Sequence, residues 1–228
     1  MIVAVHQPQY LPWLGYFEKI ARADRFVMLD IVQFKKNEFQ NRNKIKTAQG
    51  WQWLTVPVRF KFPMTIAEVP INNDTNWRNK HLQALISNYT KTPFFKDYRV
   101  QFKSLLEQEW HMLTDINRAT IDLIVQALGI TTPLDDPSKW SLSNDPTGRL
   151  VDICKHLNAD TYLAGAGGHD YMDLAQFDQA GIRVEFQSFT HPTYTQNFGT
   201  FEPYMSAIDL LFNHGPESLN ILLGEKSS

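Results

Sequence analysis

The sequence predicts an α/β fold: a Rossmann-like, mostly parallel sheet with helices on both faces and a helical middle segment. Three observations lead to this prediction. An apolar run, an amphipathic segment and a second apolar run fill residues 2–29. Apolar residues at helical spacing dominate residues 77–128. The alternation of helices and short apolar runs then returns after residue 145. Such alternation is typical of a parallel sheet covered by helices.

Length and composition fit one globular domain. The chain has 228 residues, of which 43% are hydrophobic and 20% are charged, so it can bury a sizeable core. We therefore expect a single α/β domain over residues 1–228. Residues 72–130 would form a mostly helical insertion in it or cover one face of the sheet.

The first part of the chain predicts a βαβ unit. Ile2–Val5 is a short apolar run typical of a buried strand. Leu14–Ala23 has one apolar face at helical spacing, and Phe26–Leu29 predicts a second buried strand. Two strands joined in this way are parallel, with a right-handed crossover.

The middle of the chain predicts two short strands followed by helices. The strands are Thr55–Val58 and Glu68–Ile71, with a hairpin at residues 60–65 and prolines that favour sheet edges. The expected helices are Trp77–Tyr89, Phe94–Trp110 and Asp115–Leu128, the last closed by Gly129.

The last part returns to the α/β rhythm after a polar linker at residues 131–145. Asp145 is expected to cap a helix, and Ser206 with Asp209 resembles a capping box. The expected elements are the helix Thr147–Leu157, the strand Thr161–Ala164, the helix Tyr171–Ala180, the strand Ile182–Phe189 and the helix Ala207–Asn213.

The first candidate site is the loop that follows the first strand. It carries His6, Gln7, Gln9, Tyr10 and Trp13, and its two prolines stiffen it. Ligands of α/β sheets bind at the carboxyl ends of the strands, so His6 is a candidate general base or phosphate ligand. The alternative is a buried, hydrogen-bonded histidine at a strand end.

The second candidate site is the basic, amide-rich segment after the second strand. Its residues 33–46 carry a local charge of +4, from Lys35, Lys36, Arg42, Lys44 and Lys46 against Glu38. Guanidinium binds phosphate through two hydrogen bonds, and carboxamides bind hydroxyls. The predicted substrate-binding residues here are Gln33, Lys35, Asn41, Arg42 and Asn43. The alternative is a solvated charged surface.

The third candidate site is a glycine-rich loop between a strand and a helix. Glycine lets a backbone approach a ligand closely. The loop contains Gly165, Gly167, Gly168, His169, Asp170 and Tyr171, and His169 is a second candidate catalytic residue. The alternative is a tight turn in which Asp170 caps the next helix.

Charge and cysteine content exclude several other classes. The net charge of −2 gives no overall basic field, so no nucleic-acid partner is expected. The single Cys154 lies on the apolar side of its helix and is assigned to the core, and the histidines show no metal-binding spacing. No targeting segment or membrane-spanning run is visible, so we expect a cytoplasmic protein without membrane insertion.

Several of these segments together resemble the WbqC-like protein family. They are HQPQYLPWLGY, QNRNKI, WLTVPV, DTYLAGAGGHDYMD and FEPYMSAIDLLFNHG, which span residues 6–215. Members of that family occur in bacterial gene sets for surface polysaccharides, including O-antigen. The resemblance therefore implies work on nucleotide-linked or lipid-linked sugars. A fainter similarity links the opening segments to HxGH nucleotidyltransferases, although the chain lacks the HxGH motif itself.

The leading hypothesis is a transferase of lipopolysaccharide biosynthesis. It would bind a nucleotide-linked amino sugar, or another anionic small molecule, and transfer an acyl or aminoacyl group to the sugar amine. The donor could be an activated thioester, and no cofactor is expected. One alternative is an adenylating or nucleotidyl-transferring enzyme that uses ATP and Mg²⁺. The other is a non-catalytic partner in a glycosylation complex.

Overall fold

The computed structural model describes residues 1–225 and contains two compact units. Unit 1 comprises Met1–Gln7, Glu18–Leu29 and Thr131–Thr190. Unit 2 comprises Pro8–Phe17, Asp30–Ile130 and His191–Ser228, of which the last three residues lie outside the described part. The chain passes between the units several times, and the single domain with an insertion at residues 72–130 stays a prediction.

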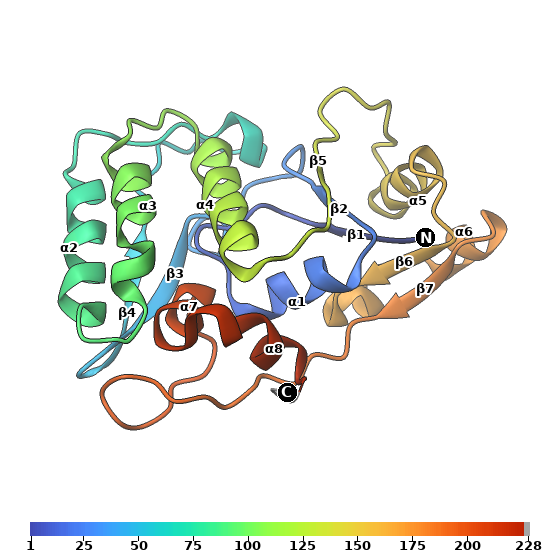
Figure 1. Ribbon diagram of the computed structural model, residues 1–228. Coiled ribbons are helices and arrows are strands. Elements are labelled where there is room, and N and C mark those ends of the chain that lie inside the picture. Colours follow the sequence, from blue (N-terminus) through green and yellow to red (C-terminus); the bar gives the residue numbers. More distant parts are fainter. Residues whose placement is uncertain (226–228) are drawn as a thin grey trace. The chain divides into compact units, whose positions relative to one another are not determined.

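Unit 1 contains a five-stranded parallel sheet in the order β5-β2-β1-β6-β7 (Figure 1). The strands are β1 (Ile2–His6), β2 (Arg25–Met28), β5 (Leu134–Asp135), β6 (Thr161–Ala164) and β7 (Arg183–Phe186). If the five strands of this sheet are numbered 1 to 5 along the chain, their order in the sheet is 3-2-1-4-5, which is the arrangement of Rossmann folds. The predicted α/β, Rossmann-like fold is confirmed.

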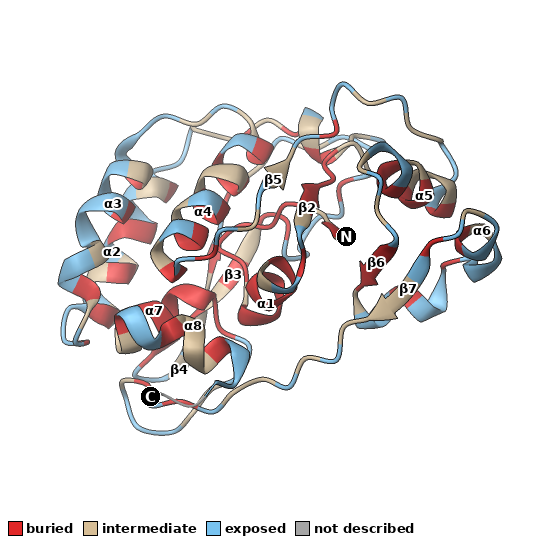
Figure 2. Cartoon of the chain, turned by 45° about the vertical axis from the view of Figure 1, so that its right-hand side comes forward, coloured by how far each residue is buried: buried red, intermediate tan, exposed pale blue. Residues whose placement is uncertain are grey.

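Apolar side chains explain the central strands of this sheet. The middle residues of β1 and all residues of β6 are buried, as expected of strands covered on both faces, and Figure 2 shows this burial along β2 and β6. Helices α5 (Pro146–His156) and α6 (Leu174–Gln179) pack against each other. The predicted cap of α5 is present, since the Asp145 carboxylate accepts a hydrogen bond from the Gly148 amide at 2.6 Å.

The connections of the sheet reverse direction between β1 and β6. Helix α1 (Leu14–Arg22) leads from β1 to β2, whereas α6 leads from β6 to β7 on the opposite side of the sheet order. Right-handed crossovers in opposite directions place α1 and α6 on opposite faces. The carboxyl ends of β1 and β6 therefore form a topological switch point, where open α/β sheets bind ligands.

Unit 2 combines one antiparallel hairpin with a set of helices. The hairpin consists of β3 (Arg42–Thr47) and β4 (Gly50–Thr55). The helices are α2 (Trp77–Tyr89), α3 (Phe95–Glu107), α4 (Leu113–Leu128), α7 (Ala207–His214) and α8 (Ser218–Leu223), with short 3₁₀ turns at Ile66–Glu68 and Gly215–Glu217. Phe212 lies at the centre of the core, with the rings of Tyr89, Phe95 and Phe102 at centroid distances of 5.1–5.3 Å.

The predicted strand pair in the middle of the chain is wrong. Val58 and Ile71 form only an isolated bridge, because Pro57 and Pro70 supply no amide hydrogens to a ladder. The hairpin lies earlier, at residues 42–55, and its first strand falls within the basic, amide-rich segment that the sequence marked as a candidate site. Its cations pack against tryptophan rings, and this contact gives the polar strand an apolar partner.

Three smaller predictions are also corrected. Helix α6 begins at Leu174, and its cap is Asp173 rather than Asp170. The predicted linker contains the short strand β5. Ser206 makes no capping bond, because the Asp209 carboxylate instead accepts hydrogen bonds from Tyr89, Tyr194 and Gln196.

None of the helices described over residues 1–225 is both long enough and apolar enough to span a lipid bilayer.

Candidate functional site

A cavity of about 320 Å³ lies at the switch point of the sheet in unit 1. Its walls come from the ends of β1, β2 and β6 and from the helices beside them. The lining residues are Val5, His6, Gln7, Lys19, Leu29, Leu150, Tyr162, Gly165, Gly167, Gly168 and Tyr171. Six residues that the sequence singled out therefore share one cavity: His6, Gln7, Gly165, Gly167, Gly168 and Tyr171. Their roles in ligand binding stay predictions.

His6 is the last residue of β1 and is partly buried beside the cavity. Its Nδ1 atom lies 3.0 Å from the carbonyl oxygen of Gln7, which can only accept, so Nδ1 carries the proton of the neutral ring. Burial and the nearby charge of Lys19 lower the pKa of His6 from 6.5 to about 4, against a smaller opposing effect of the Gln7 bond. At neutral pH the ring is uncharged and Nε2 has a lone pair to accept a proton or hydrogen bond.

Lys19 is a buried lysine in the same cavity, with 2% of its surface exposed. Its Nζ atom donates a hydrogen bond to the Val5 carbonyl oxygen at 2.9 Å. Burial lowers the pKa of Lys19 from 10.5 to about 7, although the charge of Glu18 opposes this change. The amine therefore exchanges protons near neutral pH, which is the property required of a general acid or base.

Glu18 precedes Lys19 on α1 and is also buried. Its carboxylate accepts a hydrogen bond from the Gln187 side chain and lies 3.5 Å from the guanidinium of Arg22. These two partners hold the Glu18 side chain in place, and the charge of Glu18 partly opposes the effect of burial on the pKa of Lys19.

The glycine-rich turn follows β6 and closes the other side of the cavity. Residues Ala166–Asp170 form a 3₁₀ turn. A Cβ atom added at Gly165 would lie 4.0 Å from the Lys19 Nζ atom, whereas one added at Gly167 would meet nothing within 4 Å. A Cβ atom at Gly168 would meet three side chains at 3.3 Å. Gly168 is therefore closely surrounded by neighbouring side chains, whereas Gly167 has open space around it beside the cavity.

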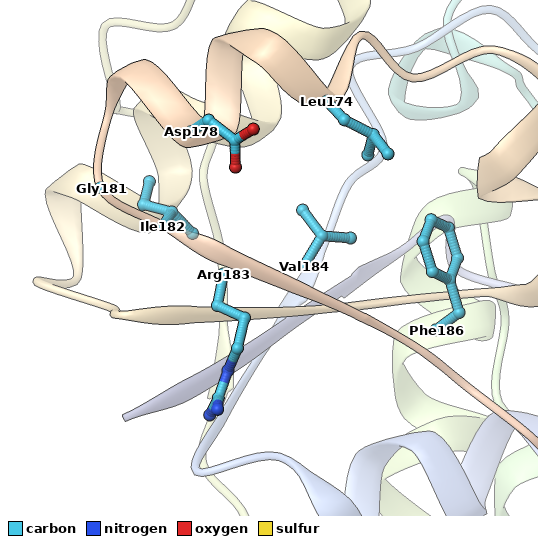
Figure 3. Close-up of a pocket in the computed structure, with 7 residues that line it drawn as sticks. All are labelled: Leu174, Asp178, Gly181, Ile182, Arg183, Val184 and Phe186. Carbon is cyan, nitrogen blue, oxygen red and sulfur yellow. The ribbon is translucent and has the colours of Figure 1, made fainter.

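The structure places His169 and Asp170 outside the cavity lining. Both are exposed, and the His169 ring stacks on Phe186. Phe186 lines a second pocket, of about 390 Å³, between α6 and the edge strand β7 (Figure 3). The charged residues of its lining are Asp178 and Arg183. The Arg183 side chain points away from Asp178, and its guanidinium lies 3.2 Å from the Glu185 carboxylate. This second pocket offers no comparable proton-transfer chemistry.

The remaining residues of the first loop belong to unit 2. The Tyr10 hydroxyl lies 2.9 Å from the Nδ1 atom of His81, and both side chains are buried. Gln9 is buried as well, and Trp13 lies beside Tyr204 with their ring centroids 5.9 Å apart. The contacts of Tyr10 and Trp13 give them a packing role within unit 2, and their ligand-binding role stays a prediction.

Unit 2 also contains the basic, amide-rich segment. The side-chain amides of Asn41 and Asn43 are buried and donate to the carbonyl oxygens of Val56 and Leu11, at 3.0 and 2.8 Å. The Arg42 guanidinium lies over the Trp53 ring at 4.2 Å. Gln33 and Lys35 are exposed. Among the described residues the cavity lining comes from unit 1 alone, so a joint site of His6 with Asn41–Asn43 stays a prediction.

Sequence reasoning missed Lys19. On a helical wheel it lies away from Leu14, Phe17 and Ile20, so the amphipathic pattern of α1 predicts a solvent-exposed lysine. The structure buries this side of the helix too. The sequence contains no signal for that burial, because it depends on how the end of β1 meets α1.

The arrangement suits a neutral or anionic ligand more than a metal ion. A neutral imidazole, an amine and glycine amides can accept one proton and hold a developing negative charge. Within residues 1–225, no three His, Cys, Asp or Glu side chains cluster in a way that could hold a metal.

Comparison with known proteins identifies the family of the chain. The model of the WbqC-like protein family matches residues 7–221. The chain is also 38% identical over 224 residues to the uncharacterized protein Rv1507c of Mycobacterium tuberculosis strain H37Rv, and the alignment covers 96% of each chain. No solved structure matches the chain significantly. The family match covers most of the chain, from the Gln7 of the cavity onward, and the chain belongs to the WbqC-like protein family.

Proposed function

We propose that the protein is a transferase that acylates or aminoacylates the amine of a nucleotide-linked sugar, in the assembly of a bacterial surface polysaccharide such as O-antigen. The observation that carries this proposal is the pairing of a neutral imidazole with a lysine of pKa about 7 in one switch-point cavity. The chain belongs to the WbqC-like family, and the sugar substrate is what the resemblance to that family implies. The volume of about 320 Å³ suits the sugar end of such a ligand.

The chemistry requires a base that is active at neutral pH. A sugar amine attacks the carbonyl carbon of an activated thioester, so a C–N bond forms and a C–S bond breaks. In the proposed mechanism neutral Lys19 takes the proton from the attacking amine and returns it to the leaving thiolate. A pKa near the working pH makes Lys19 a better base than His6, whose pKa of about 4 makes its ring a weak one.

His6 would act as a positioning residue for the amine. Its Nδ1 atom bonds to the Gln7 carbonyl, and this contact leaves Nε2 as the acceptor of the ring. An acceptor beside the cavity can orient an N–H bond of the sugar amine. The amides of the glycine-rich turn can then stabilise the negative oxygen of the tetrahedral intermediate.

A ligand-binding screen tests the proposal. Thermal unfolding is measured with UDP-, dTDP- and GDP-linked amino sugars and with ATP·Mg²⁺, because a ligand that binds the folded state raises the melting temperature. We expect a rise with at least one nucleotide-linked amino sugar, and loss of that rise in Lys19→Met. The matched control is Lys139→Met, an exposed lysine of unit 1.

The same screen distinguishes the alternatives. The strand order 3-2-1-4-5, with a glycine-rich turn at the switch point, also favours an adenylating or nucleotidyl-transferring enzyme that uses ATP and Mg²⁺. A rise with ATP·Mg²⁺ alone would support that reading and contradict the acyltransferase. No rise with any nucleotide would favour a non-catalytic partner in a glycosylation complex.

A further inference from the structure

The outer surface of the β3–β4 hairpin gathers cations and aromatic rings. We define the hairpin face as Phe39, Arg42, Lys44, Trp51 and Trp53. Arg42 and Lys44 are alternate residues of β3 and point to the same side, as does Trp53, the cross-strand partner of Lys44. The Lys44 Nζ atom lies 4.2 Å from the Trp51 ring and 5.3 Å from the Trp53 ring. Contact with a ring holds each cation in a fixed place.

Two side chains of the hairpin face are exposed, the other three are partly buried, and its cations lack anionic partners. Trp51 is 43% exposed and Phe39 is 37% exposed, although large aromatic side chains usually lie inside. Within residues 1–225 neither Arg42 nor Lys44 forms an ion pair with a carboxylate. The Arg42 Nε atom is buried without a hydrogen-bond partner in that part of the chain. Two ordered cations are thus available to an anion.

A groove of about 500 Å³ continues from the hairpin face along α2. Trp53 belongs to both. Beside the Trp53 ring the groove offers groups that bind hydroxyls. The lining residues are Gln52, Trp53, Leu54, Thr55, Pro57, Thr75, Trp77, Lys80, His81 and Ala84. Broad rings beside amide and hydroxyl groups suit a ligand with apolar ring faces and many hydroxyls.

We propose that the hairpin face and this groove bind an acidic saccharide. Its carboxylate or phosphate groups pair with Arg42 and Lys44, and its sugar rings pack on Trp51 and Trp53. Its hydroxyls bond to Thr55, which lies on the same face of β4 as the two tryptophans. This surface adds glycan binding to the proposed function but does not depend on the unit 1 cavity.

Charge decides between a saccharide and single-stranded RNA, the other polymer that aromatic and basic surfaces bind. A protein that tracks a nucleic-acid backbone usually neutralises about six to ten phosphates. The hairpin face offers two ordered cations, and the groove adds Lys80. The other polar groups of the groove, Gln52, Thr55 and Thr75, carry no charge. A sparsely charged polymer rich in hydroxyls fits this balance.

Isothermal titration calorimetry of the full chain tests the proposal. The probes are tetragalacturonate, its neutral methyl ester, a phosphorylated mannan oligosaccharide and poly(U). We expect at least one acidic saccharide to bind, with the methyl ester at least about tenfold weaker than the free acid, a difference of about 1.4 kcal/mol. The two acidic probes show whether carboxylate or phosphate is preferred.

Variants assign the binding to the hairpin face. Arg42→Gln and Lys44→Gln should each weaken the binding about tenfold, and Trp51→Ala should do the same with little change in melting temperature. Lys91→Gln, an exposed lysine of unit 2, and Lys19→Met in the cavity should leave it unchanged. Absence of binding to either acidic probe, equal binding of the methyl ester, unchanged binding in Arg42→Gln and Lys44→Gln, or tighter binding of poly(U) would each overturn the proposal.

Discussion

The two units differ in the surroundings of the polar residues compared below. In unit 1 the imidazole of His6 and the amine of Lys19 line a cavity, and burial lowers the pKa of both. In unit 2 the side-chain amides of Asn41 and Asn43 are buried and bonded to backbone carbonyls. His6, Asn41 and Asn43 looked like ligand-binding residues in the sequence, whereas Lys19 did not. A polar residue near a strand end is thus a candidate for chemistry only where the fold leaves it beside open space.

The substitution Lys19→Met is the strongest test of this difference between the units. A buried lysine whose pKa is lowered from 10.5 to about 7 destabilises the fold at neutral pH, because the unfolded chain binds the proton more tightly. This cost is about 4 kcal/mol at pH 7. Methionine removes it but also removes the hydrogen bond to the Val5 carbonyl, so we expect the free energy of unfolding to rise by about 3 kcal/mol. Chemical denaturation at pH 7 measures it. The same variant should lose the rise in melting temperature with the nucleotide-linked amino sugar.

The opposite result would reassign Lys19. If Lys19→Met lowered stability while Lys139→Met did not, the bond to the Val5 carbonyl would be structurally essential, and the case for a catalytic lysine would fail. A residue that costs stability yet supports ligand binding is typical of functional sites.

Unit 2 predicts the reverse pattern for Asn43→Ala. This substitution removes the bond to the Leu11 carbonyl and leaves that acceptor buried, so the free energy of unfolding should fall by about 2 kcal/mol. Asn79→Ala, on the exposed side of α2, is the matched control and should change it by less than about 0.5 kcal/mol. Denaturant titration measures both. Loss of ligand binding with unchanged stability would instead restore Asn43 as a site residue.

The pH dependence of stability compares one histidine in each unit. Burial lowers the pKa of His6 and of His81 from 6.5 to about 4. The unfolded chain therefore binds protons that the folded chain does not, and stability present above pH 6.5 is lost as the pH falls toward 4. Each histidine contributes a slope of up to about 1.4 kcal/mol per pH unit.

Two variants separate these contributions. Unfolding of His6→Gln and His81→Gln is followed between pH 7 and pH 4, and each variant should show a shallower loss of stability than the parent chain. A parent-like slope in His6→Gln would mean that its ring titrates normally and is more open to water than the structure indicates.

The sequence could predict elements with a strong apolar pattern. Helix α2 spans Trp77–Tyr89 and strand β6 spans Thr161–Ala164, both with the predicted bounds. The common position of His6 and the glycine-rich turn follows from parallel strands, whose carboxyl ends share one edge. The hairpin at Arg42–Thr47 and Gly50–Thr55 could not be predicted in this way. Cations packed on tryptophan rings across its strands take the place of the usual alternation of apolar and polar residues. The burial of Lys19 likewise depends on tertiary packing.

The smallest predicted effect concerns the glycine-rich turn. A Cβ atom at Gly167 meets nothing within 4 Å, so Gly167→Ala should change the free energy of unfolding by less than about 0.5 kcal/mol. Gly168→Ala should cost more, because its Cβ atom presses on Ala164, Met172 and Phe186 at 3.3 Å. If a ligand fills the cavity, Gly167→Ala should weaken its binding while leaving the unliganded protein intact, as measured by the thermal shift with the nucleotide-linked sugar. Unchanged binding in Gly167→Ala would show that no ligand atom approaches this turn, and the negative oxygen of the proposed intermediate would need another donor.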